Sequence, residues 1–553
     1  MILKMLSSSL IRFFRSIASA WRGESAFFIF CLGLCLLIGL LSFVIPLLAW
    51  IHDSIEYLRV SSLFEPSLLA VVHFTVKQML LSTLISAGVG LSLGVFLGRL
   101  TTHVKAVGIL SGFAIPLAVP TVVSALGWMS FLGRSFNLLY SQKAVILAHC
   151  FYNIPLVILA VAQARRAIHA QSFDAIRSLG GSRWEEWRIV VWPEVKWPFL
   201  SACAQTASFC AMSFALVLIL GGGPPVQTLE TEIFYRIKFG QYDPEGALSC
   251  AFWEFALTLV PWAIVAWAEN RQRRDGTSAP RGTSFRAEQL AAHPSPNIFL
   301  RGVKKTEWSS FFWVGLISIF FLVPYFFVLE PQALKMFLRK EFLVQVASAT
   351  AVSFQMAFLT SSGVVGLSAL LVVGLRFTSV SEALKRGVRI LVGAPSGVSV
   401  FILGLGVALA YGRWIDPFEG SGVALVALQG CIFFPLAFRL LWPVLKQEDS
   451  PSWSAARSLG ASWRQAFWML EWPRWQAPLL SVWSGVFGAC LGEVGIVSVF
   501  GSEKRMPLSL LLTQKMQRYR FEEAQAIAAL LFVFSIGSIL CAFYFWKFKR
   551  SRE

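Results

Sequence analysis

The stretch AFFIFCLGLCLLIGLLSFVIPLLAW at residues 26–50 contains no charged residue. About 20 consecutive apolar residues are enough for a helix to cross the hydrocarbon core of a bilayer. The whole chain agrees with this stretch, because 56% of its 553 residues are hydrophobic and only 14% are charged. Soluble domains typically carry about 25% charged residues. The composition therefore excludes a large soluble protein and predicts an all-α, polytopic membrane protein.

Further apolar runs follow the first one, and together they form two sets of six. The runs lie near 26–50, 78–98, 106–133, 144–164, 199–221 and 246–268, and then near 308–329, 342–375, 390–412, 421–445, 479–501 and 524–546. The segment between the sets is polar and rich in Pro, Gly and Ser, which is typical of a linker. We therefore predict about twelve transmembrane helices, with one six-helix half at 1–268, a linker at 269–308 and a second half at 309–553.

The two halves contain the same motif at one constant offset, without a gap. DAIRSLGGSRWEEWRIVVWP occupies 174–193, and SAARSLGASWRQAFWMLEWP occupies 454–473. Outside this motif, PTVVS at 120–124 is similar to PSGVS at 395–399. Six crossings are an even number, so both halves enter the membrane in the same direction. The sequence therefore predicts two parallel repeats.

The loops differ in their content of Lys and Arg, which indicates the orientation. With the N-terminus inside, the cytoplasmic tails and loops hold more than twice as many of these residues as the outside loops, the bias typical of cytoplasmic loops. We predict that both termini, the linker and both copies of the motif are cytoplasmic. The net charge of +18 then reflects topology and contact with the anionic lipid bilayer, and no nucleic-acid partner is expected.

Each copy of the motif is predicted to form two helical pieces joined at a glycine. The first piece ends at Gly180 or Gly460, where a glycine allows a sharp turn with positive φ. The second piece is amphipathic and suits a helix that lies against the inner leaflet. It is expected to stop at Pro193 or Pro473, because proline cannot continue the hydrogen-bond ladder. Two such elements on one face favour a docking role over an interfacial helix without a partner.

The spacing of Ala, Leu and Gly in both copies resembles the EAA loop of permeases from binding-protein-dependent ABC importers. The resemblance covers nearly the whole chain, and it implies EAA-like loops at 170–198 and 450–478 that dock on a dimer of a cytoplasmic ATPase. The family's leading Glu is Asp174 in the first copy and Ser454 in the second, so the second copy lacks an acidic contact. The coupling residues that the resemblance implies are Asp174, Ala175, Arg177, Leu179 and Gly180, and Ala455, Ala456, Arg457, Leu459 and Gly460.

Permeases with two halves in one chain occur in ferric-iron and thiamine importers. LGGGPPVQTLETEIF at 220–234 and GEVGIVSVFG at 492–501 are most similar to the thiamine permease group. The resemblance implies a bacterial inner-membrane permease that receives thiamine or its phosphates from a periplasmic or extracellular binding protein. That protein would dock near 222–243 and 502–523. Import of ferric iron is the alternative, and an ion-gradient-driven secondary carrier, which leaves the doubled motif unexplained, is a second one.

The sequence lacks the motifs of a nucleotide or metal site. No GxxxxGK[ST] phosphate-binding sequence occurs in the chain, so ATP and Mg²⁺ are expected in the partner ATPase and this chain is not expected to be an enzyme. All nine cysteines lie in apolar runs without a CxxC pair, which predicts neither disulfides nor a metal site. No cofactor is expected in this chain.

Uncharged polar residues and prolines mark two further features of the predicted helices. His149 and Asn153 are four residues apart and share a helix face. They would line the translocation pathway or form hydrogen bonds between helices. Pro116 and Pro120 in the first half, and Pro395 in the second, are predicted to break two equivalent helices.

Three charged residues lie well inside predicted membrane helices, namely Glu254, Arg439 and Glu493. Such charges are costly in a bilayer and usually face protein or a water-filled cavity. Glu493 would face a cationic substrate in the translocation pathway, or it would form a structural ion pair with Arg439 of the neighbouring helix.

Overall fold

The computed structural model describes residues 24–57, 62–100, 113, 115–135, 138–238, 243–274, 315, 317–377, 381–414, 422–445, 451–501 and 505–550. Helices form nearly all of the regular structure in these residues, and no β-strand occurs there apart from isolated bridges such as Gly223 with Val226. The predicted all-α fold class is confirmed. The N-terminal tail and most of the predicted linker lie outside the described residues, and residues 269–274 of that linker continue a helix.

The helices follow the same order in both halves. The first half contains α2 (Glu24–Gly39), η1 (Leu40–Val44), α3 (Ile45–Tyr57), η2 (Ser62–Phe64), α4 (Pro66–Leu100), α6 (Ile115–Ala118), α7 (Thr121–Ser135), α8 (Gln142–Arg166), α9 (Ala170–Ser178), α10 (Arg183–Glu185), η3 (Glu186–Val191), α11 (Trp192–Ala211), α12 (Ala215–Gly221), α13 (Leu229–Lys238) and α14 (Pro244–Arg274). The second half contains α17 (Val323–Val328), α18 (Pro331–Leu334), η5 (Lys335–Leu338), α19 (Lys340–Phe377), α20 (Glu382–Gly393), η6 (Ala394–Gly397), α21 (Val400–Tyr411), α22 (Gly422–Leu445), α23 (Pro451–Ser458), α24 (Trp463–Ala466), η7 (Phe467–Glu471), α25 (Trp472–Leu491), α26 (Gly495–Phe500), α27 (Leu508–Gln517) and α28 (Phe521–Arg550).

Nine helices in the described ranges are long and apolar enough to cross a membrane, or ten if the bent pair Arg183–Ala211 and Ala215–Gly221 is one span. Two of the predicted crossings instead contain short apolar helices, Thr121–Gly133 and Val400–Tyr411. Each of these helices follows a proline-containing break, between α6 and α7 or at η6. Proline removes a backbone donor and interrupts the helical ladder. The predicted helix breaks therefore lie at equivalent places in the two halves.

Wide helical turns precede several prolines. The π-helical segments η1, η3 and η7 are followed two residues later by Pro46, Pro193 and Pro473. In a π-turn the backbone bonds run over five residues, so the turn makes room for a proline ring that would clash with the carbonyl four residues before it. The expectation that Pro193 and Pro473 end the second helical piece is therefore wrong. The helix passes through each proline and continues as α11 or α25.

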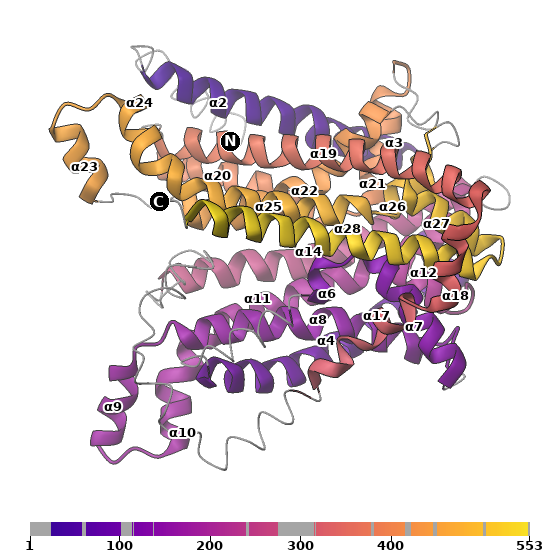
Figure 1. Ribbon diagram of the computed structural model, residues 1–553, viewed down its shortest axis with the longest axis horizontal. Coiled ribbons are helices and arrows are strands. Elements are labelled where there is room, and N and C mark those ends of the chain that lie inside the picture. Colours follow the sequence, from indigo (N-terminus) through magenta and orange to yellow (C-terminus); the bar gives the residue numbers. More distant parts are fainter. Residues whose placement is uncertain are drawn as a thin grey trace.

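The two halves exchange their first helices. In Figure 1 the first half lies mainly below and the second half above, but α2 and α3 lie on the side of the second half. There α2 packs against α19 and α3 packs against α21, while α17 of the second half packs against α7 of the first. The largest buried hydrophobic cluster contains residues from both halves, such as Phe151, Phe401 and Phe487. The halves therefore share one core.

Close backbone contacts hold both exchanged helices. A Cβ atom on Gly127 of α7 would lie 2.1 Å from the carbonyl oxygen of Pro324 in α17, and one on Gly406 of α21 would lie 2.3 Å from that of Pro46 in α3. No side chain fits at these distances, so glycine is required at both crossings. The two contacts match, because a glycine of the first half meets a proline of the second, and a glycine of the second half meets a proline of the first. The same packing geometry therefore occurs twice at the interface between the halves.

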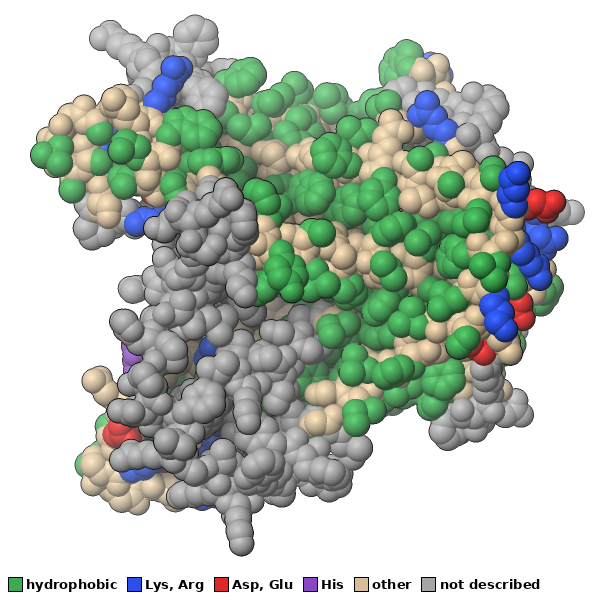
Figure 2. All heavy atoms as spheres, in the orientation of Figure 1, with side chains coloured by type: hydrophobic (Ala, Val, Ile, Leu, Met, Phe, Trp, Pro, Cys, Tyr) green, Lys and Arg blue, Asp and Glu red, His purple; other side chains and the backbone are tan. Residues whose placement is uncertain are grey.

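The distribution of side chains on the surface agrees with a membrane protein. Figure 2 shows hydrophobic side chains over the middle of the visible face, with Lys, Arg, Asp and Glu toward the two ends. A band of this kind can contact lipid hydrocarbon, and charges at the ends can remain in water.

Candidate functional site

Two short helices project from the same end of the molecule, one from each half. Figure 1 shows α9 and α10 below and α23 and α24 above at this end, where α28 also ends. In each half, the short helix lies between the two long helices α8 and α11, or α22 and α25. The parallel repeat thus places both copies of the motif on one surface.

The same turn ends both short helices. Gly180 has φ +77° and Gly460 has φ +86°, the left-handed region that side chains with a Cβ rarely adopt. The N–H of Gly181 donates to the carbonyl of Ile176 at 2.9 Å, and the N–H of Ala461 donates to that of Ala456 at 3.0 Å. A Cβ on either turn glycine would meet open space within 4 Å. These positions therefore require glycine for the backbone conformation, not for lack of room.

A capping box begins the second piece in each copy. The Oγ atom of Ser182 accepts from the N–H of Glu185, whose carboxylate accepts from the N–H of Ser182 at 2.6 Å. Ser462 and Gln465 form the same pair, with the return bond at 2.9 Å. Sequence reasoning missed these residues, although Ser followed three positions later by Glu or Gln is the signal for this cap.

Nearly all of the predicted coupling residues are exposed. Leu179 and Leu459 are each 87% exposed. A single exposed leucine carries little information, but equal exposure at two equivalent helix ends makes these two leucines the candidate contact residues of the loops. The other exposed members are Asp174, Ala175, Arg177, Gly180, Ala455, Arg457 and Gly460, whereas Ala456 is half-buried.

The first loop is held by one buried ring and a surface ion pair. Phe173 is buried in a cluster with residues of α8 and η3, and the guanidinium carbon of Arg165 lies 4.1 Å from its ring centre. Arg177 Nε donates to Glu186 Oε1 at 2.6 Å, and Arg177 Nη1 lies 3.9 Å from Asp174 Oδ1. The hydrogen bond to Glu186 raises the pKa of the Arg177 guanidinium. Because Arg177 and Asp174 are largely exposed, water screens these charges.

A buried ion pair holds the second loop. Arg376 at the end of α19 donates to both carboxylate oxygens of Glu471 at 2.9 Å, and the two side chains are 4% and 5% exposed. Arg376 also donates to the carbonyl of Leu445, and Trp475 Nε1 donates to Glu471 Oε2 at 3.2 Å. These bonds join the last turns of α19 and α22 to the start of α25.

Aromatic rings support the same loop. The ring centre of Phe377 lies 5.5 Å from that of Trp453 in α23 and 5.4 Å from that of Trp463 in α24. Trp463 stacks on Phe467 at 4.9 Å. The short helix of the second copy is therefore attached to the membrane helices through a series of rings.

His149 and Asn153 lie inside the first half. They are 2% and 3% exposed on α8. Asn153 Nδ2 donates to the sulfur of Cys210 on α11 at 3.3 Å, and Gln78 Nε2 of α4 donates to the carbonyl of Cys210 at 2.7 Å. Neither ring nitrogen of His149 has a hydrogen-bond partner among the described residues. Asn153 thus bonds between helices, and the pathway role of both residues remains a prediction.

The structure separates Glu493 from Arg439. Arg439 Nη2 pairs with Glu269 at 3.1 Å, and its Nη1 donates to Gln205 at 2.7 Å. The alternative of a Glu493–Arg439 ion pair is therefore wrong. Arg439 lies near the end of α22 that leads to the second loop, whereas Glu493 follows the far end of α25. The two helices run in opposite directions between these points, so nearness along the helix order does not bring the charges together.

The two segments expected to receive a binding protein are mostly helical. Residues 229–238 form α13, which packs against α4, α14, α21 and α26, and residues 508–517 form α27, which packs against α19, α26 and α28. Glu230, Ile233 and Phe234 of α13 are buried. In the first segment, the exposed residues include Gly222, Pro224 and Pro225, which precede α13.

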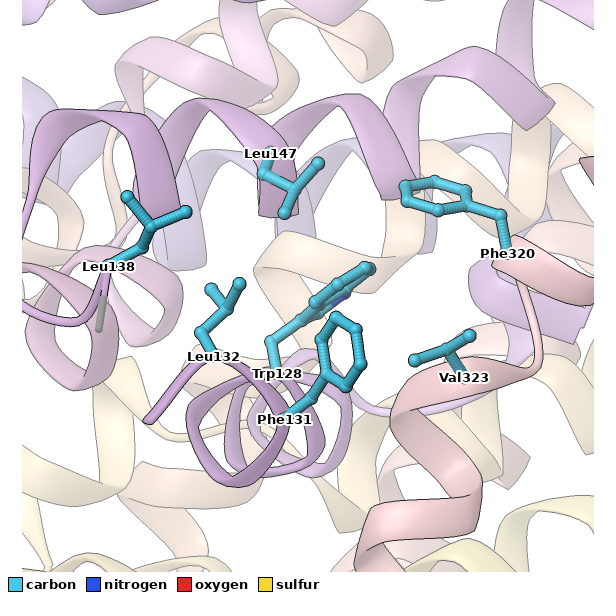
Figure 3. A pocket seen from close by; sticks show the side chains of 7 residues that line it. All are labelled: Trp128, Phe131, Leu132, Leu138, Leu147, Phe320 and Val323. Carbon is cyan, nitrogen blue, oxygen red and sulfur yellow. The ribbon is translucent and has the colours of Figure 1, made fainter. Parts of the chain in front are cut away.

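An apolar pocket of about 260 Å³ lies between α7, α8 and the start of the second half. Figure 3 shows its lining side chains, among them Trp128, Leu147, Phe320 and Val323. Its lining residues carry no charged group. This pocket therefore lacks the chemistry to bind a charged solute.

Comparisons with known proteins agree with the duplicated architecture. The chain is 25% identical to the thiamine transport system permease protein ThiP of Brucella abortus (strain 2308) over 501 residues, which are 87% of this chain and 88% of that protein. It is 23% identical to ThiP of Escherichia coli (strain K12) over 487 residues, 83% of this chain and 86% of that protein. No family model matches the chain.

A shorter relative matches only part of the chain. The probable sulfate transport system permease protein cysT of Helicosporidium sp. subsp. Simulium jonesii is 24% identical over 195 residues, 33% of this chain but 72% of that protein. A third of the chain thus corresponds to most of a smaller permease, as expected for a protein with two permease halves. The chain is thus similar through both of its halves to the thiamine transport permeases, and this similarity supports a fused permease with both halves in one polypeptide.

Proposed function

We propose that this protein is the membrane permease of an ATP-driven importer of thiamine or its phosphates in a bacterial inner membrane. The observation that carries this proposal is the similarity to ThiP proteins over more than four fifths of the chain, through both halves. The relatives' names supply the substrate class, and the two equivalent exposed loops supply the means of coupling to a motor.

The partner at the loops is a dimeric ATPase. A two-fold dimer presents the same surface twice, and α9 and α23 present the same short helix twice at one end of the molecule. Leu179 and Leu459 would enter apolar clefts of the two ATPase subunits, because each is an exposed apolar side chain at the tip of its helix. ATP and Mg²⁺ belong to those subunits.

Helix continuity provides a route from the loops to the membrane interior. α10, η3 and α11 form one unbroken helix, and α24, η7 and α25 form its counterpart. Each helix extends for about 40 Å, at 1.5 Å per residue, from the loop to a break at 212–214 or 492–494. A displacement of either loop would therefore reach these breaks without an intervening hinge. A solute-binding protein would dock at the opposite end, near α13 and α27.

Growth and uptake assays test the substrate. Cells that cannot synthesise thiamine should require this permease to grow on trace thiamine, and deletion should abolish the uptake of labelled thiamine. Ferric-iron uptake in the same strains is the control. Unchanged thiamine uptake together with loss of iron uptake would refute the thiamine proposal and support the iron alternative.

Thiol labelling tests the orientation. The described part of the chain has one exposed cysteine, Cys541, so the assay starts from a Cys541→Ser variant. Leu179→Cys and Leu459→Cys should be protected from an impermeant reagent in intact cells. Leu338→Cys should react, because this side chain is 85% exposed and precedes α19 at the end opposite to Arg376, which pairs with the second loop. The reverse pattern would place the loops outside and exclude a cytoplasmic ATPase.

A further inference from the structure

Three glutamates from separate elements meet at the seam between the halves. Glu230 lies on α13, Glu254 lies on α14, and Glu493 lies in the break between α25 and α26. The carboxyl groups of Glu230 and Glu254 are within hydrogen-bonding reach of each other, and the charge of Glu493 acts on Glu230. Ser399, at the start of α21 in the second half, donates to Glu230 Oε1 at 2.8 Å. Both halves therefore contribute to one acidic cluster.

Two of these carboxyl groups are fully buried, since Glu254 and Glu230 are 0% and 1% exposed, and Glu493 is half-buried. Glu493 Oε1 accepts from the N–H of Ile496 at 3.0 Å, but its Oε2 has no hydrogen-bond partner among the described residues. Apart from the neighbouring carboxyl of Glu230 and the hydroxyl of Ser399, no described residue offers a hydrogen bond to Glu254. Two carboxyl groups in contact away from water can share one proton, and any further charge on the pair then needs a cationic or hydrogen-donating partner.

The basic side chain on the same helix as Glu230 is occupied elsewhere. Arg236 of α13 pairs with Glu232 and Asp243. Among the described residues, no Lys or Arg forms an ion pair with any of these three glutamates. The described part of the chain therefore supplies no positive charge to neutralise them.

Aromatic rings lie beside the acidic cluster. A Cβ on Gly495 would lie 3.1 Å from Glu493 Oε1 and 3.9 Å from a ring carbon of Phe214, which places these two groups around one point. The ring centre of Phe214 lies 5.2 Å from that of Phe401 and 5.0 Å from that of Phe234. Carboxylates together with aromatic faces are the combination that recognises organic cations, because the ring face is electron-rich.

The cluster occurs on one side of the two-fold arrangement only. Ser213 occupies the position of Glu493 in the first copy, after the end of α11. Ser509, the second residue of α27, matches Glu230, the second residue of α13. Alignment of YDPEGA with YRFEEA places Leu531 opposite Glu254. The three carboxyl groups are therefore present once in the molecule, as a site for one ligand requires.

We infer that Glu230, Glu254 and Glu493, with Phe214 and Phe401, form an internal binding site for an organic cation in transit between the halves. This inference rests on the proposed function, since thiamine carries a quaternary thiazolium ring and an amino group. The thiazolium would lie against the rings near Glu493, and the amino group would donate to the Glu230–Glu254 pair. Opposite charge and hydrogen donors would then satisfy the unmet oxygens.

The test uses the complete importer, with its ATPase and binding protein, in proteoliposomes and with labelled thiamine as the probe. Glu254→Gln and Glu493→Gln should each lower thiamine uptake by about thirtyfold or more, the loss typical of removing one partner of a buried charge pair. ATP hydrolysis stimulated by the loaded binding protein should persist. Glu341→Gln is the matched control, because Glu341 is an exposed acid at the start of α19.

Thermal stability separates a binding role from a structural one. If the carboxylates lack partners in the free protein, a neutral amide of the same shape should leave the melting temperature unchanged or raise it. A fall in melting temperature for Glu254→Gln would instead assign the residue a structural role and overturn the inference. Uptake within twofold of wild type in both variants would also overturn it while leaving the proposed function intact. A wild-type importer that takes up no thiamine would contradict the proposed function itself.

Discussion

The two loops at one end of the molecule share their backbone but not their supports. Both contain a short helix, a glycine with positive φ, a capping box and a π-turn before a proline. The first is held by Phe173 and an exposed ion pair, and the second by a buried ion pair and stacked rings. The exposed tip of each loop is therefore built alike in both copies, while its attachment to the membrane helices differs.

One residue accounts for much of this difference. The position of Glu471 in the second copy is Val191 in the first, at the same point of the motif. Arg99 ends α4 as Arg376 ends α19, but a valine offers Arg99 no carboxylate. The first loop therefore cannot use a buried pair at this place, and Val191 joins an apolar cluster instead. Two loops with the same surface geometry can thus be held either by an apolar cluster or by a buried ion pair.

The buried pair should give the largest difference between the loops. Glu471→Leu leaves the guanidinium of Arg376 buried without a carboxylate, so the free energy of unfolding should fall by about 3–5 kcal/mol. Denaturant titration of the purified permease in detergent measures this change. The double variant Arg376→Leu, Glu471→Leu should lose less than the sum of the single changes. Additive losses would show that the two side chains do not form a coupled pair.

The turn glycines should give the next largest effect. Gly180→Val and Gly460→Val force a β-branched residue into left-handed backbone, at a cost of roughly 1–2 kcal/mol that falls on the turn alone. We expect ATPase co-purification and stimulated hydrolysis to drop, and to drop more for Gly180, because rings brace the second helix.

Asparagine variants serve as the control for these glycines. Gly180→Asn and Gly460→Asn should retain most of the coupling, since asparagine tolerates positive φ. Full association and stimulation in the double valine variant would contradict the docking role of the loops.

Removal of the capping serine should destabilise the two copies by equal amounts. This comparison tests whether the two capping boxes are equivalent. Ser182→Ala and Ser462→Ala should each destabilise the start of the second helical piece by about 1 kcal/mol. Hydrogen exchange of the amides at 183–186 and 463–466 reports this loss. Ser178→Ala is the control, because its hydroxyl bonds within the preceding helix. A clearly unequal response of the two caps would show that the local geometries are not equivalent in energy.

The surface ion pair should give the smallest effect. Arg177→Ala removes the contacts with Glu186 and Asp174, and the resulting loss of stability should be small and should shrink further at high salt, because water and ions screen exposed charges. Arg457→Ala, which removes a hydrogen bond to the carbonyl of Ala461 in the second copy, is the matched comparison. A loss of stability in Arg177→Ala that does not shrink at high salt would contradict the screened ion pair.

Features that depend on neighbouring residues could be predicted from the sequence, and contacts between distant residues could not. The turns after the short helices and the breaks in the membrane helices each depend on the backbone properties of a single residue. The glycines Gly180 and Gly460 therefore indicate the turns, and the prolines Pro120 and Pro395 indicate the breaks. Glu230 was missed because its segment reads as a polar outside loop. The apolar residues Leu229, Ile233 and Phe234 around it were the available signal for a buried helix.

The sequence alone determined the membrane-embedded all-α class and predicted two parallel halves with paired loops, because hydrophobic length, periodic repetition and turn chemistry act locally along the chain. Only the tertiary structure decided the exchange of the first helices, the Arg376–Glu471 pair and the meeting of Glu230, Glu254 and Glu493. Each of these joins elements far apart in the sequence. Their energies come from close packing and from charges removed from water, and both depend on which surfaces the folded chain brings together.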